Sequence, residues 1–191
     1  MNVKDISINQ VEPHSGATPL FVAAEHGHLN IVQLLIQVDG IDINQPNKQK
    51  GTPLFVACQY NQYNVVHELL LKKDLIHINV LDNDHETPLW TASSNGHYTI
   101  VQNLLQNVDI HVNQSRRDKS TALYMACQNG HLNVIQLLLQ GEFVFFNDCF
   151  GNSDHENIYY LKVLSILHPC IYIYELVHGY SFFYFFFTAK N

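Results

Sequence analysis

Histidine is the residue in this sequence with the clearest capacity for chemistry, because it binds metals and transfers protons near neutral pH. The 191 residues include 12 histidines and 4 cysteines. Their spacing matches no metal-binding motif. His26 and His28 are two residues apart and would point to different sides of a helix, and no H-E-x-x-H or paired Cys/His spacing occurs. We therefore predict no metal site.

Motifs for catalysis are also missing from the sequence. It contains no glycine-rich phosphate loop, no G-x-S-x-G nucleophile elbow and no set of kinase motifs. Cys58 and Cys127 occupy the slot that Ala24 and Ser93 fill elsewhere, so we interpret them as small core residues in a reducing compartment. We expect neither enzymatic activity nor a cofactor.

The histidines instead belong to a repeated pattern that organises most of the chain. TPLFVAAEHGHLNIVQLL begins at Thr18, and related segments begin at Thr52, Thr87 and Thr121. The steps between these threonines are 34, 35 and 34 residues. A fixed period in this range is typical of a stacked-repeat protein.

Each copy predicts two short helices joined by a turn. A threonine hydroxyl can cap the first helix, and the proline after it is tolerated at the first helical position. Glycine ends that helix in three copies, at Gly27, Gly96 and Gly130. The second helix carries an apolar stripe, which in the first copy consists of Ile31, Val32, Leu34 and Leu35. An asparagine follows each second helix, at Asn44, Asn79, Asn113 and Asn147. In the first three copies we expect its side chain to bond the backbone of adjacent turns.

This pattern resembles the ankyrin repeat over roughly residues 6 to 150. The matching features are Thr-Pro-Leu, the small-residue pair, Gly-His and the Leu pair. The resemblance implies an all-α solenoid of stacked helix-turn-helix pairs with hairpin-like finger loops. The sequence departs from the family where aromatic residues replace a histidine, where Asn61-Gln62 replaces Gly-His, and where Ala122 replaces proline. The aromatic residues are Phe21, Phe55, Trp90 and Tyr124. We interpret them as packing between repeats rather than as a stacking platform for bases.

We predict three segments in the chain. Residues 1–15 are a remnant of a preceding repeat, residues 16–150 form the array, and residues 151–191 are a degenerate fifth repeat with an aromatic-rich tail. The repeats start near 16, 50, 85 and 119. Because repeat arrays need covered ends, we expect either that the chain is a fragment or that the first copy serves as a makeshift cap. The tail has three readings: a cap on copy four, a membrane-associated segment, or non-native sequence.

The composition of the chain limits the classes of partner that we expect it to bind. The formal net charge of −7 opposes general nucleic-acid binding, which needs a basic surface. The first residues contain no apolar run typical of a signal peptide, so we expect an intracellular, cytoplasmic protein. The finger loops alternate in charge: Lys48 and Lys50 precede an acidic finger with Asp84 and Glu86, and Arg117 lies in the last finger.

The resemblance implies a non-enzymatic protein-interaction module, a scaffold or adaptor, that acts as a monomer and binds a protein partner on its concave surface. Family contact positions carried onto this sequence give fifteen binding residues: Glu25, His26, Lys48, Gln49, Gln59, Tyr60, Asn83, Asp84, Glu86, Ser94, Asn95, Arg117, Asp118, Gln128 and Asn129. Tyr60 is the expected anchor, since tyrosine offers a large area at low entropic cost. The alternative is a membrane-tethered repeat protein anchored by the aromatic tail.

Overall fold

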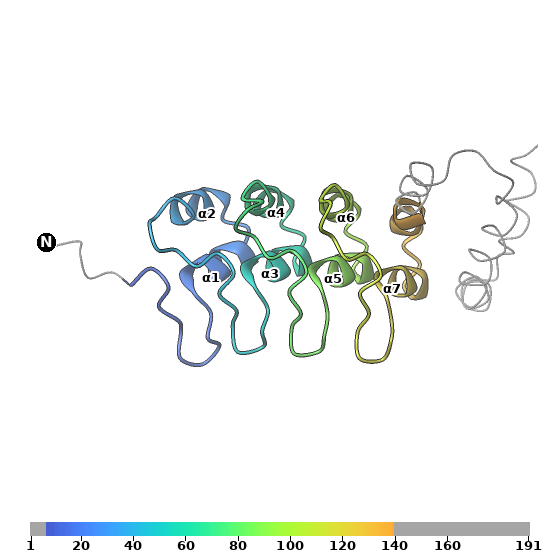
Figure 1. Cartoon of the computed structure of the whole chain (residues 1–191), viewed down its shortest axis with the longest axis horizontal. Coiled ribbons are helices and arrows are strands. Elements are labelled where there is room, and N and C mark those ends of the chain that lie inside the picture. The colour runs from blue at the N-terminus through green and yellow to red at the C-terminus, as the bar shows by residue number, and fades with distance from the viewer. Residues whose placement is uncertain (1–6, 140–191) are drawn as a thin grey trace, which may run out of the picture.

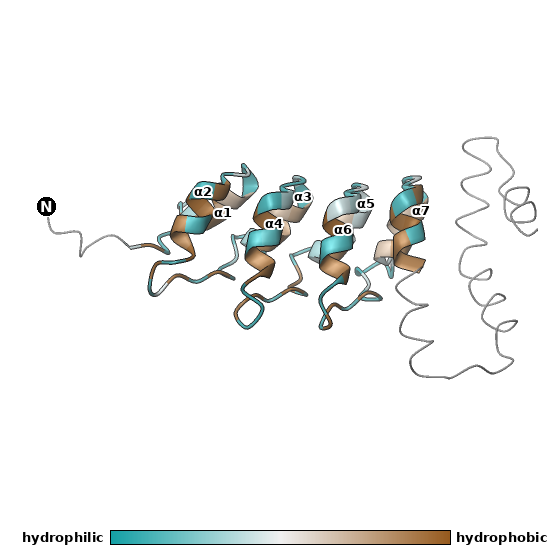
Figure 2. Cartoon of the chain, turned by 90° about the horizontal axis from the view of Figure 1, so that it is seen from above, coloured by the Kyte–Doolittle hydropathy of each residue, from teal (hydrophilic) through white to brown (hydrophobic). Residues whose placement is uncertain are grey.

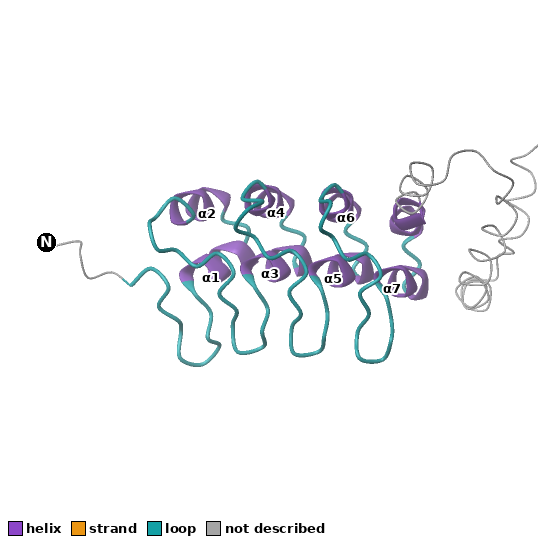
Figure 3. Ribbon diagram, viewed as in Figure 1, coloured by secondary structure: helices purple, strands orange, loops and turns teal. Residues whose placement is uncertain are grey.

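Seven labelled helices lie in two rows in the structure, a computed structural model that describes residues 7–139 (Figure 1). One row contains α1 (Pro19–Glu25), α3 (Pro53–Gln59), α5 (Pro88–Ser94) and α7 (Ala122–Gln128). The other row contains α2 (Leu29–Leu35), α4 (Tyr63–Leu70), α6 (Tyr98–Leu105) and a last helix over 132–139. The described residues contain no strand (Figure 3), so the predicted all-α solenoid is confirmed. The three readings of the tail lie outside the described residues.

Threonine caps begin all four helices of the first row, as predicted. The Thr18 hydroxyl accepts a hydrogen bond from the Phe21 N–H at 3.1 Å, and the equivalent threonines do the same at 3.0 to 3.2 Å. Ala122 replaces proline at the first position of α7, and the cap from Thr121 is retained. Proline therefore helps these helix starts without being required for them.

The turns between paired helices need a residue in the left-handed conformation. Gly27, Gly96 and Gly130 have φ angles of 70°, 72° and 75°, and Asn61 takes the same place at 58°. The side chain at the next position reaches back to the preceding repeat. His131 Nε2 bonds the Ser94 carbonyl at 2.9 Å, and Gln62 Nε2 bonds the Glu25 carbonyl at 3.0 Å in the copy that lacks Gly-His. The departure in copy two thus preserves the bond between repeats.

The core lies between the rows and between successive repeats. The small-residue slot is fully buried at Ala24, Cys58 and Ser93, which lets neighbouring helices approach closely. Phe21, Phe55 and Trp90 are each 6% exposed, which confirms the packing role predicted for these aromatic residues, whereas Tyr124 is 41% exposed. Each second helix carries hydrophobic and hydrophilic residues together (Figure 2), as expected for a helix with one face on the core.

The apolar stripe predicted for the second helix of copy one is only partly buried. Val32 is fully buried, but Ile31 is 48% exposed and Leu34 is 68% exposed. The residues equivalent to Ile31 in the next copies, Val65 and Ile100, are 1% and 0% exposed. The difference has a simple cause: each later helix is covered by the repeat before it, and no described helix precedes α1 and α2 (Figure 1).

Asparagine side chains tie the loop of each repeat to the next loop. Asn44 donates from Nδ2 to the Leu75 carbonyl at 2.7 Å and accepts the His77 N–H at 2.8 Å. Asn79 makes the same pair of bonds with Asp109 and His111, and Asn9 makes it with Gly40 and Asp42. The predicted bonding role of these asparagines is confirmed for Asn44 and Asn79, and Asn9 extends it to the N-terminal side.

Candidate protein-binding surface

The fingers are tight hairpins that project away from the helix rows (Figure 1). They span 12–17, 47–51, 82–86 and 116–120, each closed by a backbone hydrogen bond between its ends at 2.9 to 3.1 Å. In the second finger, Asn47 Oδ1 accepts the N–H groups of Gln49 and Gly51, both at 3.0 Å. In the third, Asp82 Oδ1 accepts those of Asp84 and Glu86 at 2.9 and 2.8 Å. These side chains fix the shape of the turns.

Hydrogen bonds also join neighbouring fingers. The Lys48 N–H donates to the Ser15 carbonyl at 2.9 Å, and Lys48 Nζ donates to the Pro13 carbonyl at 2.6 Å. One repeat further on, the Asn83 N–H donates to the Gln49 carbonyl at 2.9 Å. The fingers therefore form one connected layer rather than independent loops.

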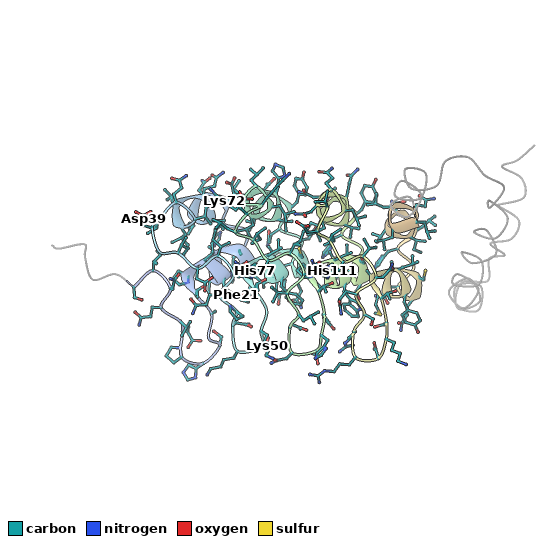
Figure 4. All side chains as sticks on the ribbon, viewed as in Figure 1. Phe21, Asp39, Lys50, Lys72, His77 and His111 are labelled. Carbon is teal, nitrogen blue, oxygen red and sulfur yellow. The ribbon has the colours of Figure 1, made fainter. Side chains whose placement is uncertain are left out.

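The predicted finger residues lie at the tips of this layer. Most of them are exposed, namely Lys48, Gln49, Asn83, Asp84, Arg117 and Asp118. Glu86 is half-buried at the base of the third finger. Figure 4 shows Lys50 at the tip of the second finger and Lys72 beside the second-row helices, so the two lysines mark opposite sides of the array.

Arg116 is the most connected side chain between the third and fourth fingers. Its guanidinium carbon lies 5.5 Å from the centroid of the Trp90 ring, a cation–π arrangement. Its Nε lies 3.3 Å from a Glu86 carboxylate oxygen, and its terminal nitrogens lie 3.9 Å from carboxylate oxygens of Asp84 and Asp118. Trp90 Nε1 completes the contact by donating to Ser120 Oγ at 3.3 Å.

Burial of Glu86 raises the pKa of its carboxyl, and repulsion from Asp82 raises it further, against the attraction of Arg116. Three carboxylates lie within 4 Å of the Arg116 guanidinium, and Asp82 adds a fourth negative charge near Glu86, so the third finger retains an excess of negative charge. The exposed ion pairs add less than about 1 kcal/mol each to stability. The cluster therefore shapes the charge of the surface more than it stabilises the fold.

The remaining predicted residues lie at the C-terminal ends of the first-row helices. Successive first-row helices pack side by side, so the equivalent pairs form columns along the array. Most of these residues are exposed, namely His26, Gln59, Tyr60, Asn95, Gln128 and Asn129, whereas Glu25 and Ser94 are half-buried. Tyr60 has 54% of its surface exposed and is the largest side chain in these columns.

Ser94 and Asn129, both among these predicted residues, also bond each other between two repeats. Asn129 Nδ2 donates to the Ser94 carbonyl at 2.7 Å and lies 3.2 Å from Ser94 Oγ. The same carbonyl accepts His131 Nε2. Ser94 and Asn129 therefore have less hydrogen-bonding capacity left for a partner than Tyr60 or Asn95.

Sequence reasoning selected Arg117 and Asp118 in the fourth finger and missed the role of Arg116. The distinct role of Arg116 could have been inferred by aligning the four copies. Arg116 takes the place of Asn47 and Asp82, whose side-chain oxygens accept hydrogen bonds within their own turns. An arginine cannot accept such bonds. In this finger the accepting role moves to Asp118, which bonds Ser120, and Arg116 lies over Trp90 instead.

Within residues 7–139, no group of three side chains could hold a metal ion. No helix in that part of the chain is long and apolar enough to cross a membrane.

Comparison with known proteins agrees with this geometry. A family model described as ankyrin repeats, three copies, matches residues 2–82, 40–115 and 71–150. A search of curated proteins gave no match. Ankyrin repeats are in general protein–protein interaction modules rather than enzymes. The matched segments together cover most of the chain, which therefore belongs to the ankyrin-repeat family.

Proposed function

We propose that this protein is a non-enzymatic scaffold or adaptor that binds a protein partner across its finger–helix surface. This surface comprises the four finger tips and the exposed C-terminal ends of the first-row helices. The observation that supports it best is the connected finger layer, in which Lys48 bonds Ser15 and Asn83 bonds Gln49 through the backbone. A surface already fixed in shape loses little conformational freedom on binding, so more of the contact energy appears as affinity.

Tyr60 is the proposed anchor of the interface. The residue is 54% exposed, and the helix ends around it offer neutral hydrogen-bonding groups at Gln59 and Asn95. Tyrosine is enriched among the residues that dominate binding energy. Arg117 adds an exposed positive charge at the last finger, next to the excess negative charge around Glu86. We infer a partner surface that is mixed and polar, with at least one apolar pocket for the tyrosine ring.

The test uses the full chain, immobilised, to select binders from a displayed library of protein fragments. The affinity of each binder is then measured for Tyr60→Ala with Arg117→Ala. We expect the double variant to bind at least about 10-fold more weakly. The matched control combines Tyr98→Ala on α6 with Lys72→Ala after α4, which removes an aromatic and a basic side chain from the second-row side. The control should keep affinity within about 2-fold.

Circular dichroism must show that both double variants fold like the parent chain. An unchanged affinity in the Tyr60 and Arg117 variant would refute this surface. Equal losses in both double variants would also refute it, because they would place binding on no particular side of the array.

A further inference from the structure

The second, third and fourth fingers alternate in charge along the array. Finger 47–51 contains two lysines and no acidic residue, and finger 82–86 contains three acidic residues and no lysine or arginine. Finger 116–120 contains two arginines, one lysine and one acidic residue. These fingers lie side by side in chain order (Figure 1), so basic, acidic and basic surfaces follow one another along the finger layer.

The two basic fingers each hold a lysine in a strained backbone conformation. Lys50 and Lys119 have φ angles of 63° and 69°, whereas Gly16 fills the same position of the first finger at 73°. A residue with a Cβ is disfavoured in this left-handed region, so lysine there lowers a stability that glycine would keep. Strain of this kind gathers at functional sites, where the side chain is needed. Its occurrence in both basic fingers indicates a role for the lysine charge.

These lysine charges are not neutralised within the described part of the chain. Lys50 and Lys119 are exposed and form no ion pair with any described residue. Lys48 is also exposed, and its Nζ donates to the Pro13 carbonyl, a neutral group. Figure 4 shows Lys50 at the tip of its finger. The second and fourth fingers therefore present positive charge that a partner can neutralise.

The third finger keeps its negative charge in spite of Arg116. The Arg116 guanidinium lies 3.3 Å from a Glu86 oxygen and 3.9 Å from an Asp84 oxygen, and Asp82 adds a further carboxylate in the same finger. One guanidinium cannot balance three carboxylates. Asp84 is exposed, so part of this charge is open to a partner.

We propose that these three fingers bind an alternating-charge segment of the partner: an extended stretch in which an acidic, a basic and an acidic residue follow at three-residue intervals. The acidic residues would lie over Lys50 and Lys119, and the basic residue would lie over Asp84. This inference rests on the proposed function, because it states the partner chemistry for the finger part of the finger–helix surface.

The spacing of the repeats sets the three-residue interval. Successive first-row helices pack against one another, and packed helices lie about 8 to 10 Å apart. The fingers are tied at this spacing, because the Asn83 N–H donates to the Gln49 carbonyl at 2.9 Å and Arg116 Nε donates to the Asp84 carbonyl at 3.4 Å. An extended chain advances about 3.3 Å per residue, so three residues cover about 10 Å. Every third residue of such a segment meets one finger.

The test selects ten-residue peptides on the immobilised full chain from a displayed library built only from glutamate, lysine, glycine and serine. Multivalent display makes weak contacts measurable. We expect glutamate, lysine and glutamate at three-residue intervals to be enriched at least about 5-fold over the inverted pattern of lysine, glutamate and lysine. This preference opposes the overall charge, because a chain of net charge −7 attracts the inverted, cationic pattern. The enrichment should fall at about 0.5 M salt, where exposed charges are screened.

Two matched double variants locate the recognition. Lys50→Asn with Lys119→Asn removes both charges and introduces a residue that tolerates the left-handed conformation. In this variant the two patterns should be recovered within about 2-fold of each other, while the thermal unfolding midpoint stays equal or rises. Lys72→Asn with Lys73→Asn removes the same charge after α4, on the opposite side of the array, and should keep the enrichment.

Several outcomes would overturn the proposal. Equal recovery of all patterns, or enrichment that persists at high salt, would show that the finger charges do not select the partner. Unchanged enrichment in the Lys50 and Lys119 variant would place recognition elsewhere. A thymidine decamer that binds the parent chain, but not this variant, without any enriched peptide would mean that the lysines serve a nucleic acid.

Failure of this inference and failure of the proposed function give different results. The library contains no aromatic or aliphatic side chain, so it does not test the apolar pocket proposed for Tyr60. Loss of affinity in the Tyr60 and Arg117 variant without an enriched charge pattern would leave the proposed function standing and sink only the alternating-charge segment.

Discussion

The first and third repeats have an isoleucine at the same position of their second helix, but it is exposed in the first repeat and buried in the third. Ile31 in α2 is 48% exposed, and Ile100 in α6 is fully buried. The local helices are alike in length and in their turns, so the difference comes from the neighbour that α6 has and α2 lacks among the described residues. In this fold the burial of a side chain is a property of the stack rather than of its own repeat.

The largest expected effect comes from truncating these two isoleucines. Ile100→Ala should lower the free energy of unfolding by about 2 to 5 kcal/mol, because it removes buried contacts and leaves a cavity. Ile31→Ala should cost less than about 1 kcal/mol, since nearly half of that side chain is already in water. Urea denaturation, at a concentration where sedimentation shows a monomer, measures both. Equal losses would mean that the first repeat is covered in solution.

A second contrast uses two glycines that share a left-handed backbone. Gly96 has φ 72°, and a Cβ there would lie 2.5 Å from the His131 ring of the next repeat. Gly40 has φ 81°, and a Cβ added there would meet no atom within 4 Å. The His131 ring cannot move without losing its bond to the Ser94 carbonyl.

We therefore expect Gly96→Ala to destabilise the protein by roughly 2 to 3 kcal/mol, the left-handed strain plus the clash, and Gly40→Ala by roughly 1 kcal/mol. Thermal unfolding of the two variants side by side measures the difference. If Gly40→Ala destabilises the protein more than Gly96→Ala does, contact between repeats does not determine the loss of stability.

The asparagine bonds give the opposite comparison, because the loop of the first repeat is tied to the segment before it in the same way as the loops of interior repeats are tied to each other. Asn9 and Asn79 each donate to one backbone carbonyl and accept one backbone N–H of the following loop. Replacing either by alanine should cost about 1 kcal/mol, the net worth of exposed hydrogen bonds. Equal shifts in the denaturation midpoint are expected. A loss at Asn79 alone would show that the first loop is not tied in solution.

The sequence allowed a large part of the fold to be predicted, since the signals are local and repeated. Thr-Pro fixed the helix starts, and Gly27 and Asn61 fixed the turns, because caps and left-handed residues act within a few residues of themselves. The exposure of Ile31 could not be predicted, because it depends on what lies beyond the repeat. For the candidate surface, the period placed Tyr60 and Lys48 at exposed sites, whereas the position of Arg116 over Trp90 depends on a side-chain packing between fingers that spacing does not encode.

The smallest expected effect concerns two carboxyls whose pKa values move in opposite directions. Hydrogen bonds from Ser15 and His14 lower the pKa of Glu12 in the first finger, whereas burial, with repulsion from Asp82, raises the pKa of Glu86 in the third. A lowered pKa stabilises the folded state above the unfolded pKa, and that stabilisation is lost as pH falls through the folded value. A raised pKa has the opposite sign: the folded state is relatively favoured at low pH and loses that advantage as pH rises through the folded value.

Glu12→Gln should therefore lower the unfolding midpoint at pH 7, and Glu86→Gln should raise it slightly or leave it unchanged. The difference for Glu86→Gln should disappear as pH falls below the ordinary glutamate pKa of about 4.3, where Glu86 is protonated in the folded and unfolded states alike. The difference for Glu12→Gln should start to shrink there and should disappear only once pH has fallen through the lowered pKa of Glu12 in the folded state. Thermal unfolding at pH 7 and at about pH 3.5 separates the two cases. A Glu86→Gln variant that is less stable than the parent at pH 7 would contradict this prediction, because the attraction of Glu86 to Arg116 would then outweigh the cost of burying the carboxylate. In that case charge, rather than the stacking of Arg116 on Trp90, would hold the third and fourth fingers together.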